Sequence, residues 1–497
     1  MSTNSGWLSS RSGTPFELDT GLLSEVLREH RRAHGISQAD LAQLLNMDQS
    51  YVSKIETGQR HVRDLEVLLG IAHELSIPPR RLGIADEMLR PLPAPSTAVL
   101  VGVPDIVQRS QEDWCRRRRD LNRRRNRLAR EAIRLYRRDF HIGGAPFIAP
   151  PAWMPTAPVR LESVHLEWED NATGIEVDGT EPEAAAVLPL RAPGRRFDRY
   201  TSAIRYLDRP SLFENRPSYR LLEVDMSPSE SRLSCGLATY FDKLDLSEGI
   251  AHELAVSDSG KNTNTHAPPD WAELPLRALI GDPFDLRRRA VMPAIETLTL
   301  RRDRRTGAGT FLLHWRDPAK VATAAGIYGL IPAGEFQPSS IASRDRENDF
   351  DLWRNMVREY SEELLGDPER DGSQGQPLDY DNWPLYRSLE SARQDERVRA
   401  YCLGVGLDTL TLTATVLTVV VMDGDVFDSL FGDTVRINSE GVLVATAESS
   451  KVSDGVPFTE ANVRRLLADE PLASPAACIL SRSWRFRSGL LPQQGSC

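Results

Sequence analysis

The most regular pattern of apolar and polar positions along the chain occupies residues 22–82. Apolar residues recur there every three or four positions, which is typical of amphipathic helices that share one small core. Interruptions in the pattern predict five short helices, over residues 22–34, 38–45, 49–57 and 64–75 and from residue 78 onward. The predicted core consists of Leu41, Leu44, Val52, Ile55, Leu65, Leu68 and Ile71.

Capping residues and glycines mark the ends of these helices. Ser37 and Asp48 each precede a helix, and their side-chain oxygens are suited to accept hydrogen bonds from its first backbone N–H groups. Gly35 and Gly58 follow helices at positions where a left-handed residue is favoured. These signals predict two short helices joined by a tight turn at Asn46.

The same region resembles the Cro/C1-type (XRE) family of helix-turn-helix transcription regulators. The resemblance is carried by Ser37-Gln38-Ala39-Asp40-Leu41-Ala42 and Val52-Ser53-Lys54-Ile55-Glu56-Thr57-Gly58. It implies an all-α, lambda-repressor-like domain of five helices over residues 18–87. It also implies that the protein binds a two-fold symmetric operator in double-stranded DNA as a homodimer.

The resemblance assigns roles to particular side chains. In this motif the second helix lies in the major groove, and its first residues contact base edges. Gln49, Ser50 and Lys54 are expected to face the bases, since glutamine pairs with adenine and lysine with guanine. Phosphate contacts, which position the protein on DNA, are expected from Gln38, Tyr51 and Arg60.

Residues 88–158 are expected to link this domain to the rest of the chain. They begin with a proline-rich hinge, which cannot continue a helix, and go on to a helix-compatible run over 111–140. Twelve arginines fall within that run. They either contact the DNA backbone beside the operator or lie on a linking helix, solvated or paired with acidic residues of the same chain. The candidates for backbone contact are Arg123, Arg124 and Arg125.

Beyond residue 158 the chain mixes strand-like and helical segments, so the protein is expected to be multidomain with an α+β C-terminal part. Residues 159–288 form a middle α/β region of unknown type, and residues 289–497 form a second region. The expected strands are 164–168, 219–224, 297–301 and 310–314, with more within 402–422. The expected helices are 246–255, 350–365 and, as the last, 460–467.

A second resemblance lies in the C-terminal region. The motif consists of Gly326-Ile-Tyr-Gly-Leu-Ile-Pro-Ala-Gly334-Glu-Phe-Gln-Pro and, further on, Arg358-Glu359-Tyr-Ser-Glu362-Glu363-Leu-Leu-Gly366. It resembles the Nudix box, a loop and helix that bind nucleoside diphosphate derivatives. The resemblance implies a Nudix-like α+β fold over residues 289–497.

Three glutamates of this motif are three and four positions apart, so they share a helix face and favour a hard cation such as Mg²⁺. The motif is degenerate, because Ser340 stands where the family has a glutamate and Gly366 comes one position late. About ten extra residues also separate loop and helix. These departures weigh against catalysis. The resemblance assigns Glu359, Glu362 and Glu363 to the metal, Arg358 to orienting the helix and Gly334 to the loop.

Composition and charge add further constraints. With 40% hydrophobic and 27% charged residues, the chain resembles an ordinary soluble globular protein, and its polar residues 1–17 are expected to be a flexible tail. Five scattered cysteines form no CxxC pair, which fits a reducing cytoplasm, and no segment predicts a membrane span. Residues 1–140 carry a net charge of +5 and the remainder −15, so the basic end is expected to face DNA.

Different classes of function remain open. The chain is either a regulator whose C-terminal region senses a ligand, such as a nucleotide, or a Mg²⁺-dependent Nudix-type hydrolase of nucleoside diphosphate derivatives joined to a DNA-binding domain. The degenerate motif favours the regulator. A third alternative is that residues 159–497 bind another protein, which their acidic excess permits.

Overall fold

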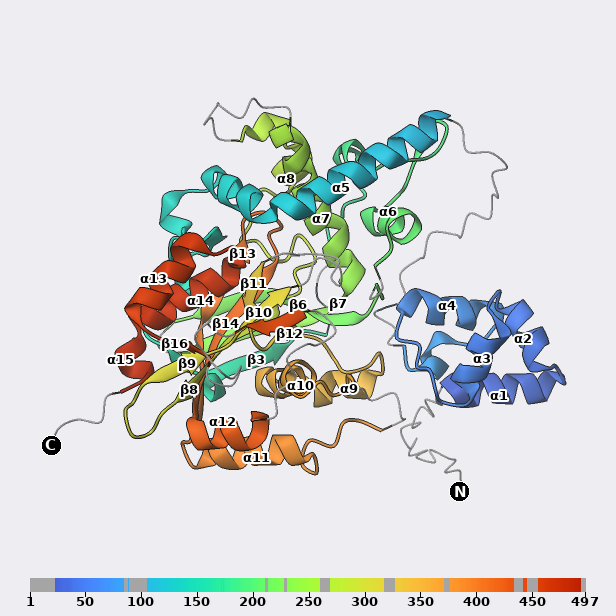
Figure 1. Cartoon of the computed structure of the whole chain (residues 1–497). Coiled ribbons are helices and arrows are strands. Elements are labelled where there is room, and N and C mark those ends of the chain that lie inside the picture. Colours follow the sequence, from blue (N-terminus) through green and yellow to red (C-terminus); the bar gives the residue numbers. More distant parts are fainter. Residues whose placement is uncertain are drawn as a thin grey trace, which may run out of the picture.

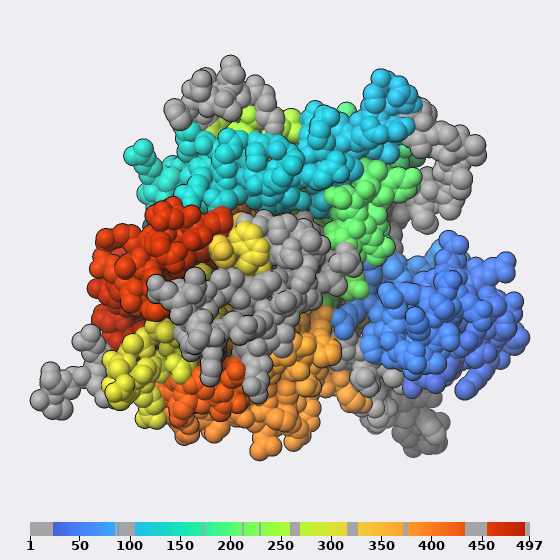
Figure 2. Space-filling model, viewed as in Figure 1, coloured from blue at the N-terminus to red at the C-terminus, as the bar shows by residue number. Residues whose placement is uncertain are grey.

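The computed structural model describes residues 23–84, 88, 105–170, 172, 174–210, 213–227, 230–259, 269–316, 327–370, 376–432, 441–444 and 455–492. The expected tail over residues 1–17 and most of the expected hinge lie outside these residues. The described residues form an N-terminal domain (23–84 and Met88) and a body (105–492). The N-terminal domain, blue in Figure 1, lies at one side of the body, and Figure 2 shows it as a separate lobe.

The N-terminal domain contains four α-helices where the sequence predicts them. The fifth predicted helix is instead a short 3₁₀ segment, Pro79–Leu82, which Gly83 ends in a left-handed conformation with φ of 77°. The α-helices are α1 (Leu23–His34), α2 (Gln38–Leu44), α3 (Gln49–Glu56) and α4 (Leu65–Glu74).

Local signals set the start of α2 and most of the core. The backbone N–H of Ser37 donates to Asp40 Oδ2 at 2.9 Å, and the Asp40 N–H donates to Ser37 Oγ at 3.2 Å. Leu44 was expected in the core, but it is 43% exposed, and Leu45 is buried in its place. One helical position turns a side chain by about 100°, which accounts for the exchange. The other predicted core residues are buried: Leu41, Val52, Ile55, Leu65, Leu68 and Ile71.

The body is an α/β region built on a mixed eight-stranded sheet. The strand order is β1-β13-β14-β8-β9-β16, with β12 also paired to β8 and β2 to β13. The long central strands are β13 (Val398–Asp408), β14 (Ala414–Asp423) and β8 (Ala294–Arg302); β14 pairs parallel with β8 and antiparallel with β13. The short strands are β1 (Phe147–Ile148), β2 (Val159–Arg160), β9 (Gly309–Phe311), β12 (Ala333–Glu335) and β16 (Val456–Pro457).

Both faces of this sheet are covered, which explains why β14 is apolar almost throughout. Val416 and Val420 face one hydrophobic cluster, whereas Leu417 and Val421 face another. The first cluster includes α10 (Leu352–Leu364), α11 (Pro384–Gln394) and α12 (Gly424–Phe431). The second includes α13 (Glu460–Asp469) and α14 (Ser474–Arg485).

Three smaller sheets and a pair of long helices belong to the described part of the body (Figure 1). Helix α5 (Asp105–Ala132) packs along α7 (Tyr240–Ser259) through a cluster that includes Leu121, Leu128 and Leu254. One small sheet has the order β3-β7-β6, the second has the order β11-β10-β15, and the third pairs β4 with β5. Their strands are β3 (Val164–Trp168), β6 (Pro217–Met226), β7 (Ser231–Thr239), β10 (Leu313–Arg316), β11 (Tyr328–Leu330) and β15 (Gly441–Val444). The remaining elements are β4 (Leu190–Ala192), β5 (Arg195–Arg196), α6 (Tyr200–Leu207), α8 (Pro275–Ile280), α9 (Ser343–Asn348) and α15 (Arg487–Leu490).

Long-range packing joins segments that the sequence analysis treats apart. One hydrophobic cluster contains Trp114, Tyr219 and Val420, which lie on different sides of the expected limits at residues 158 and 288. The prediction of a last helix over 460–467 was wrong in one respect, because α14 and α15 follow α13. Within the described residues, no helix is both long and apolar enough to cross a membrane.

Candidate nucleic-acid interface

Helix α3 is positioned by a cap at its start and by the burial of one face. The Asp48 carboxylate accepts a hydrogen bond from the Ser50 N–H at 2.7 Å, and hydrogen bonding from Ser50 lowers the pKa of Asp48. Val52 and Ile55 point into the core. The residues predicted to contact bases remain exposed on the outer side: Gln49, Ser50 and Lys54.

The residues predicted to contact phosphates have two kinds of surroundings. The Arg60 guanidinium lies over the Tyr51 ring, 4.5 Å from its centroid, so these two side chains form a unit beside α3. Gln38 Nε2 instead donates to Glu56 Oε2 at 2.6 Å, while Arg31 Nε donates to the other oxygen of Glu56 at 3.0 Å. This network ties α1, α2 and α3 together and fixes the angle between the two helices of the motif.

The start of α4 joins the N-terminal domain to the body. Asp64 caps α4 by accepting the Glu66 N–H at 3.0 Å, and it forms an ion pair with Arg205 of α6 at 3.0 Å. The Leu65 N–H donates to the Asn215 carbonyl oxygen at 2.8 Å. Asp64 therefore both starts a helix of the N-terminal domain and holds that domain to the body.

A group of charges extends this junction. The Glu369 carboxylate pairs with Arg63 of the N-terminal domain and, at 2.5 Å, with Arg216 of the body. Burial, followed by the charge of Glu369, raises the pKa of the nearby Glu362 to about 7. The charge balance of the junction therefore changes near neutral pH.

These junction contacts leave the outer face of α3 open. They include the contacts of residues 63–66, an isolated bridge between Ile84 and Ala342, and the packing of Leu237 and Ile341 against the core of the N-terminal domain. Gln49, Ser50 and Lys54 are exposed while the domain is held to the body.

The arginines predicted to contact the DNA backbone lie in α5. Arg125 is buried and pairs with Glu248, and Arg124 pairs with Asp258. Arg123 is exposed. Arg124 and Arg125 are therefore paired with acidic residues of the same chain, which is one of the alternatives for this segment. Of the three arginines, Arg123 is the one with an exposed side chain.

The glutamates of the expected Mg²⁺ site point in different directions. Glu363 accepts the Ala333 N–H at 3.0 Å, and the Glu359 carboxylate fills the space that a Cβ at Gly334 would need. Glu362 lies instead at the junction with the N-terminal domain. Consecutive helix positions differ by about 100°, which turns Glu362 away from Glu363.

The residues present therefore do not fit the Mg²⁺ site. In the part of the chain that the structure describes, no group of three or more His, Cys, Asp and Glu side chains is arranged to hold a metal ion. Arg358 is buried and donates from Nη2 to the Gln337 carbonyl at 2.6 Å and to Asn355 Oδ1 at 2.9 Å. The predicted loop and helix do pack together, but without a cluster of carboxylates.

Sequence reasoning missed a set of ionisable residues that the fold collects around a cavity in the body. They include Lys243 and Glu248 of α7, Glu296 of β8 and Asp408 at the end of β13. Apart from Lys243 and Glu248 on α7, these residues are far apart in sequence, so no spacing rule connects them. The available signal was Glu296, a charged residue inside the otherwise apolar run at the start of β8.

Comparison with known proteins identifies the N-terminal domain. Residues 22–79 match a family described as a helix-turn-helix domain. Among solved structures, the chain is similar to the restriction-modification controller protein C.AhdI from Aeromonas hydrophila, with 44% identity. That similarity covers 13% of this chain and 96% of that chain, with a TM-score of 0.12. No curated protein matches the chain. Residues 22–79 form a helix-turn-helix domain.

Proposed function

We propose that the protein is a transcription regulator that binds specific duplex DNA through α3 and whose body senses a small molecule. The observation that carries the proposal is a helix-turn-helix domain in which α3, the second helix of the motif, leaves Gln49, Ser50 and Lys54 exposed. Such a domain places its second helix in the major groove. The structural part of the motif is buried or capped, so these exposed side chains serve recognition.

Each exposed side chain has a role in this proposal. Gln49 forms two hydrogen bonds with an adenine and Lys54 donates to a guanine, while Ser50 adapts to either base. The pair of Tyr51 and Arg60, with Gln38 at the start of α2, contacts phosphates on either side of the groove. Two copies of the chain bind the two halves of a symmetric operator, as proteins of the Cro/C1 type do.

Asn215 supplies a physical link between the body and the DNA-binding domain. Its carbonyl oxygen accepts the Leu65 N–H of α4 at 2.8 Å, and its side-chain Oδ1 accepts the Phe241 N–H of α7 at 2.9 Å. A shift of α7 therefore reaches α4 through one residue. A ligand of the body regulates transcription only if its affinity differs between two states, so operator affinity must change when it binds.

The experiment is a titration of the full-length chain with an operator selected from random duplex DNA. Gln49→Ala removes one bidentate base contact, and we expect it to weaken operator binding by about 1–3 kcal/mol, roughly 5- to 150-fold. Its binding to unrelated duplex DNA stays unchanged, because phosphate contacts carry that affinity.

Gln394→Ala is the matched control, because Gln394 is an exposed glutamine at the end of α11 in the body. It should bind the operator as the unaltered chain does. Equal operator affinity of the Gln49 and Gln394 variants would remove the basis for recognition through α3.

A further inference from the structure

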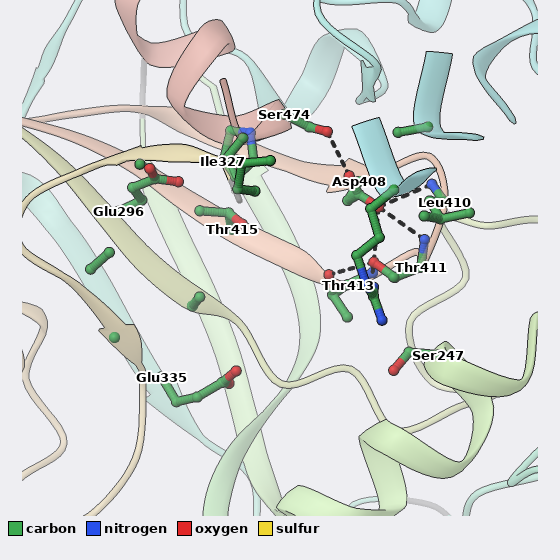
Figure 3. Close-up of a pocket in the computed structure, with 18 of the residues that line it drawn as sticks. Ser247, Glu296, Ile327, Glu335, Asp408, Leu410, Thr411, Thr413, Thr415 and Ser474 are labelled. Carbon is green, nitrogen blue, oxygen red and sulfur yellow. Dashed lines mark hydrogen bonds between the residues drawn. The ribbon is translucent and has the colours of Figure 1, made fainter. Parts of the chain in front are cut away.

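A cavity of about 370 Å³ lies within the body, lined by parts of α5, α7, β8, β12 and β13 and by the start of α14. Its size suits a small organic molecule. Figure 3 shows side chains from these elements around one space, with Ser247 of α7 on one side and Glu296 and Glu335 on the other. The tertiary fold, rather than any sequence motif, assembles this site.

The lining contains charged side chains that are almost fully buried. Lys243 is 6% exposed, Glu248 2% and Glu296 6%. Charges are costly to remove from water, and cavities left by imperfect packing are apolar. A concentration of buried charge around an open volume is therefore characteristic of a binding site.

Two ion pairs account for the arginine and the lysine of the wall. Arg125 of α5 pairs with Glu248, and Lys243 pairs with Glu335 of β12. The described lining residues contain two further carboxylates, Glu296 and Asp408, and no further lysine or arginine. The wall as described thus has four carboxylates against one arginine, one lysine and one histidine, His314, and the cavity attracts positive charge.

The hydrogen-bond donors around Asp408 are neutral. It accepts hydrogen bonds from the Leu410 N–H at 3.0 Å, the Thr411 N–H at 2.9 Å and the Ser474 hydroxyl at 2.7 Å (Figure 3). These bonds orient the carboxylate without cancelling its charge. It therefore adds to the negative potential of the cavity.

Glu335 offers a free acceptor. One of its oxygens binds Lys243, whereas Oε2 is buried and has no hydrogen-bond partner among the described residues. In Figure 3 its carboxylate points toward the space that Ser247 faces from the other side. A buried acceptor without a donor is costly, and an N–H group of a ligand placed in this space would satisfy it.

We propose that this cavity binds a small organic cation, an amine that also carries hydroxyl or other hydrogen-bonding groups. The ammonium group lies near Glu335, Glu296 and Asp408, and the hydroxyl groups of Ser247, Thr411 and Thr413 bind the polar remainder. A nucleotide fits less well, because its phosphates would face four carboxylates. This inference rests on the proposed sensing role of the body and names the class of its ligand.

The test measures binding to the full-length chain without DNA, by ligand-observed NMR and calorimetry. Glucosamine, glucose and glucuronate are probes of nearly equal size with positive, neutral and negative charge, and agmatine, spermidine and AMP extend the set. We expect at least one amine to bind at millimolar concentration or tighter, and glucuronate and AMP not to bind. Glu296→Gln should weaken amine binding by roughly tenfold, since it removes one buried charge partner.

Three variants control this test. Glu347→Gln changes an exposed glutamate outside the cavity and should leave amine binding unchanged. Ser247→Leu fills the cavity and should abolish amine binding. It provides an independent test in case the Glu296→Gln variant does not fold. Asn215→Ala should leave amine binding intact but reduce its effect on operator affinity, because Asn215 joins α7 to α4.

The outcomes separate this inference from the DNA-binding proposal. Failure of every amine to bind, or equal binding of glucuronate or AMP at the same site, overturns the cation site while operator binding stands. If the chain binds an amine but no operator, the DNA-binding proposal is overturned and the cation site stands.

Discussion

The N-terminal domain and the body reach their structures by different routes. In the N-terminal domain, each of α2, α3 and α4 begins at a capping residue directly before it: Ser37, Asp48 or Asp64. In the body, the buried partner of Arg125 is Glu248, and β14 pairs with β8 from about 120 residues earlier in the chain. Local signals mark most elements of the first, whereas the second also depends on contacts between distant segments.

The comparison also separates two kinds of site. The exposed face of α3 is made by neighbouring positions of one helix, so it can be read from a short motif. The cavity is made by side chains from Arg125 to Pro475, which meet only after the sheet and its helices have formed.

The largest effect is expected from breaking the buried ion pair between α5 and α7. Glu248→Leu leaves the Arg125 guanidinium buried without its partner and should lower the free energy of unfolding by about 3–5 kcal/mol. Urea unfolding of the full-length chain, followed by circular dichroism, measures this loss.

Arg127→Gln is the control for this pair. Arg127 is exposed and pairs with Asp258, so its loss should cost at most about 1 kcal/mol. If both variants lost the same free energy of unfolding, the buried ion pair would stabilise the body no more than the exposed one.

A smaller effect is expected where the two regions meet. Asp64→Ala removes the cap of α4 and the ion pair with Arg205, so we expect a loss of about 2 kcal/mol. Asp48→Ala removes only the cap of α3 and should cost about 1 kcal/mol. Thermal unfolding compares the two, and a larger loss for Asp48→Ala would contradict the junction described here.

The junction should also make stability depend on pH. The folded-state pKa of Glu362 is about 7, above its ordinary value of 4.5, so the folded chain binds this proton more tightly than the unfolded chain. The contribution of Glu362 is therefore fully present below pH 4.5 and is lost as the pH rises through about 7. Glu362→Gln should remove this slope and raise the unfolding free energy at pH 8 by about 1–2 kcal/mol.

Glu347→Gln, which changes an exposed glutamate, should leave the pH profile of unfolding as it is. An unaltered profile in the Glu362 variant would show that this carboxyl group does not titrate between pH 5 and 8.

The smallest expected effect concerns the salt dependence of operator binding. Arg60→Ala should reduce the slope of log affinity against log salt by about 1, because Arg60 is expected to contact a phosphate, whereas Arg124→Gln should leave it unchanged because Arg124 is paired within the body. A reduced slope for Arg124→Gln would restore the arginine segment as a DNA contact.

A site made by adjacent residues can be predicted from the sequence, whereas a site made by distant residues cannot. The cap at Asp48 and the exposure of Gln49 depend on a few adjacent residues, and both are as the sequence indicates. The sequence pattern predicted a helix over residues 350–365, where α10 lies, and this helix packs against the segment that contains Gly334. It could not show that Glu362 faces the junction, because Arg63 and Arg216 come to that place from distant parts of the chain.

The central claim is that α3 reads DNA sequence. The most direct measurement is a parallel selection from one random duplex pool by the full-length chain and by its Gln49→Ala variant, followed by sequencing of the bound DNA. We expect the unaltered chain to enrich a two-fold symmetric site and the variant to lose preference for one base pair in each half. Enrichment of the same site by both proteins, or of no site by the unaltered chain, would contradict the claim.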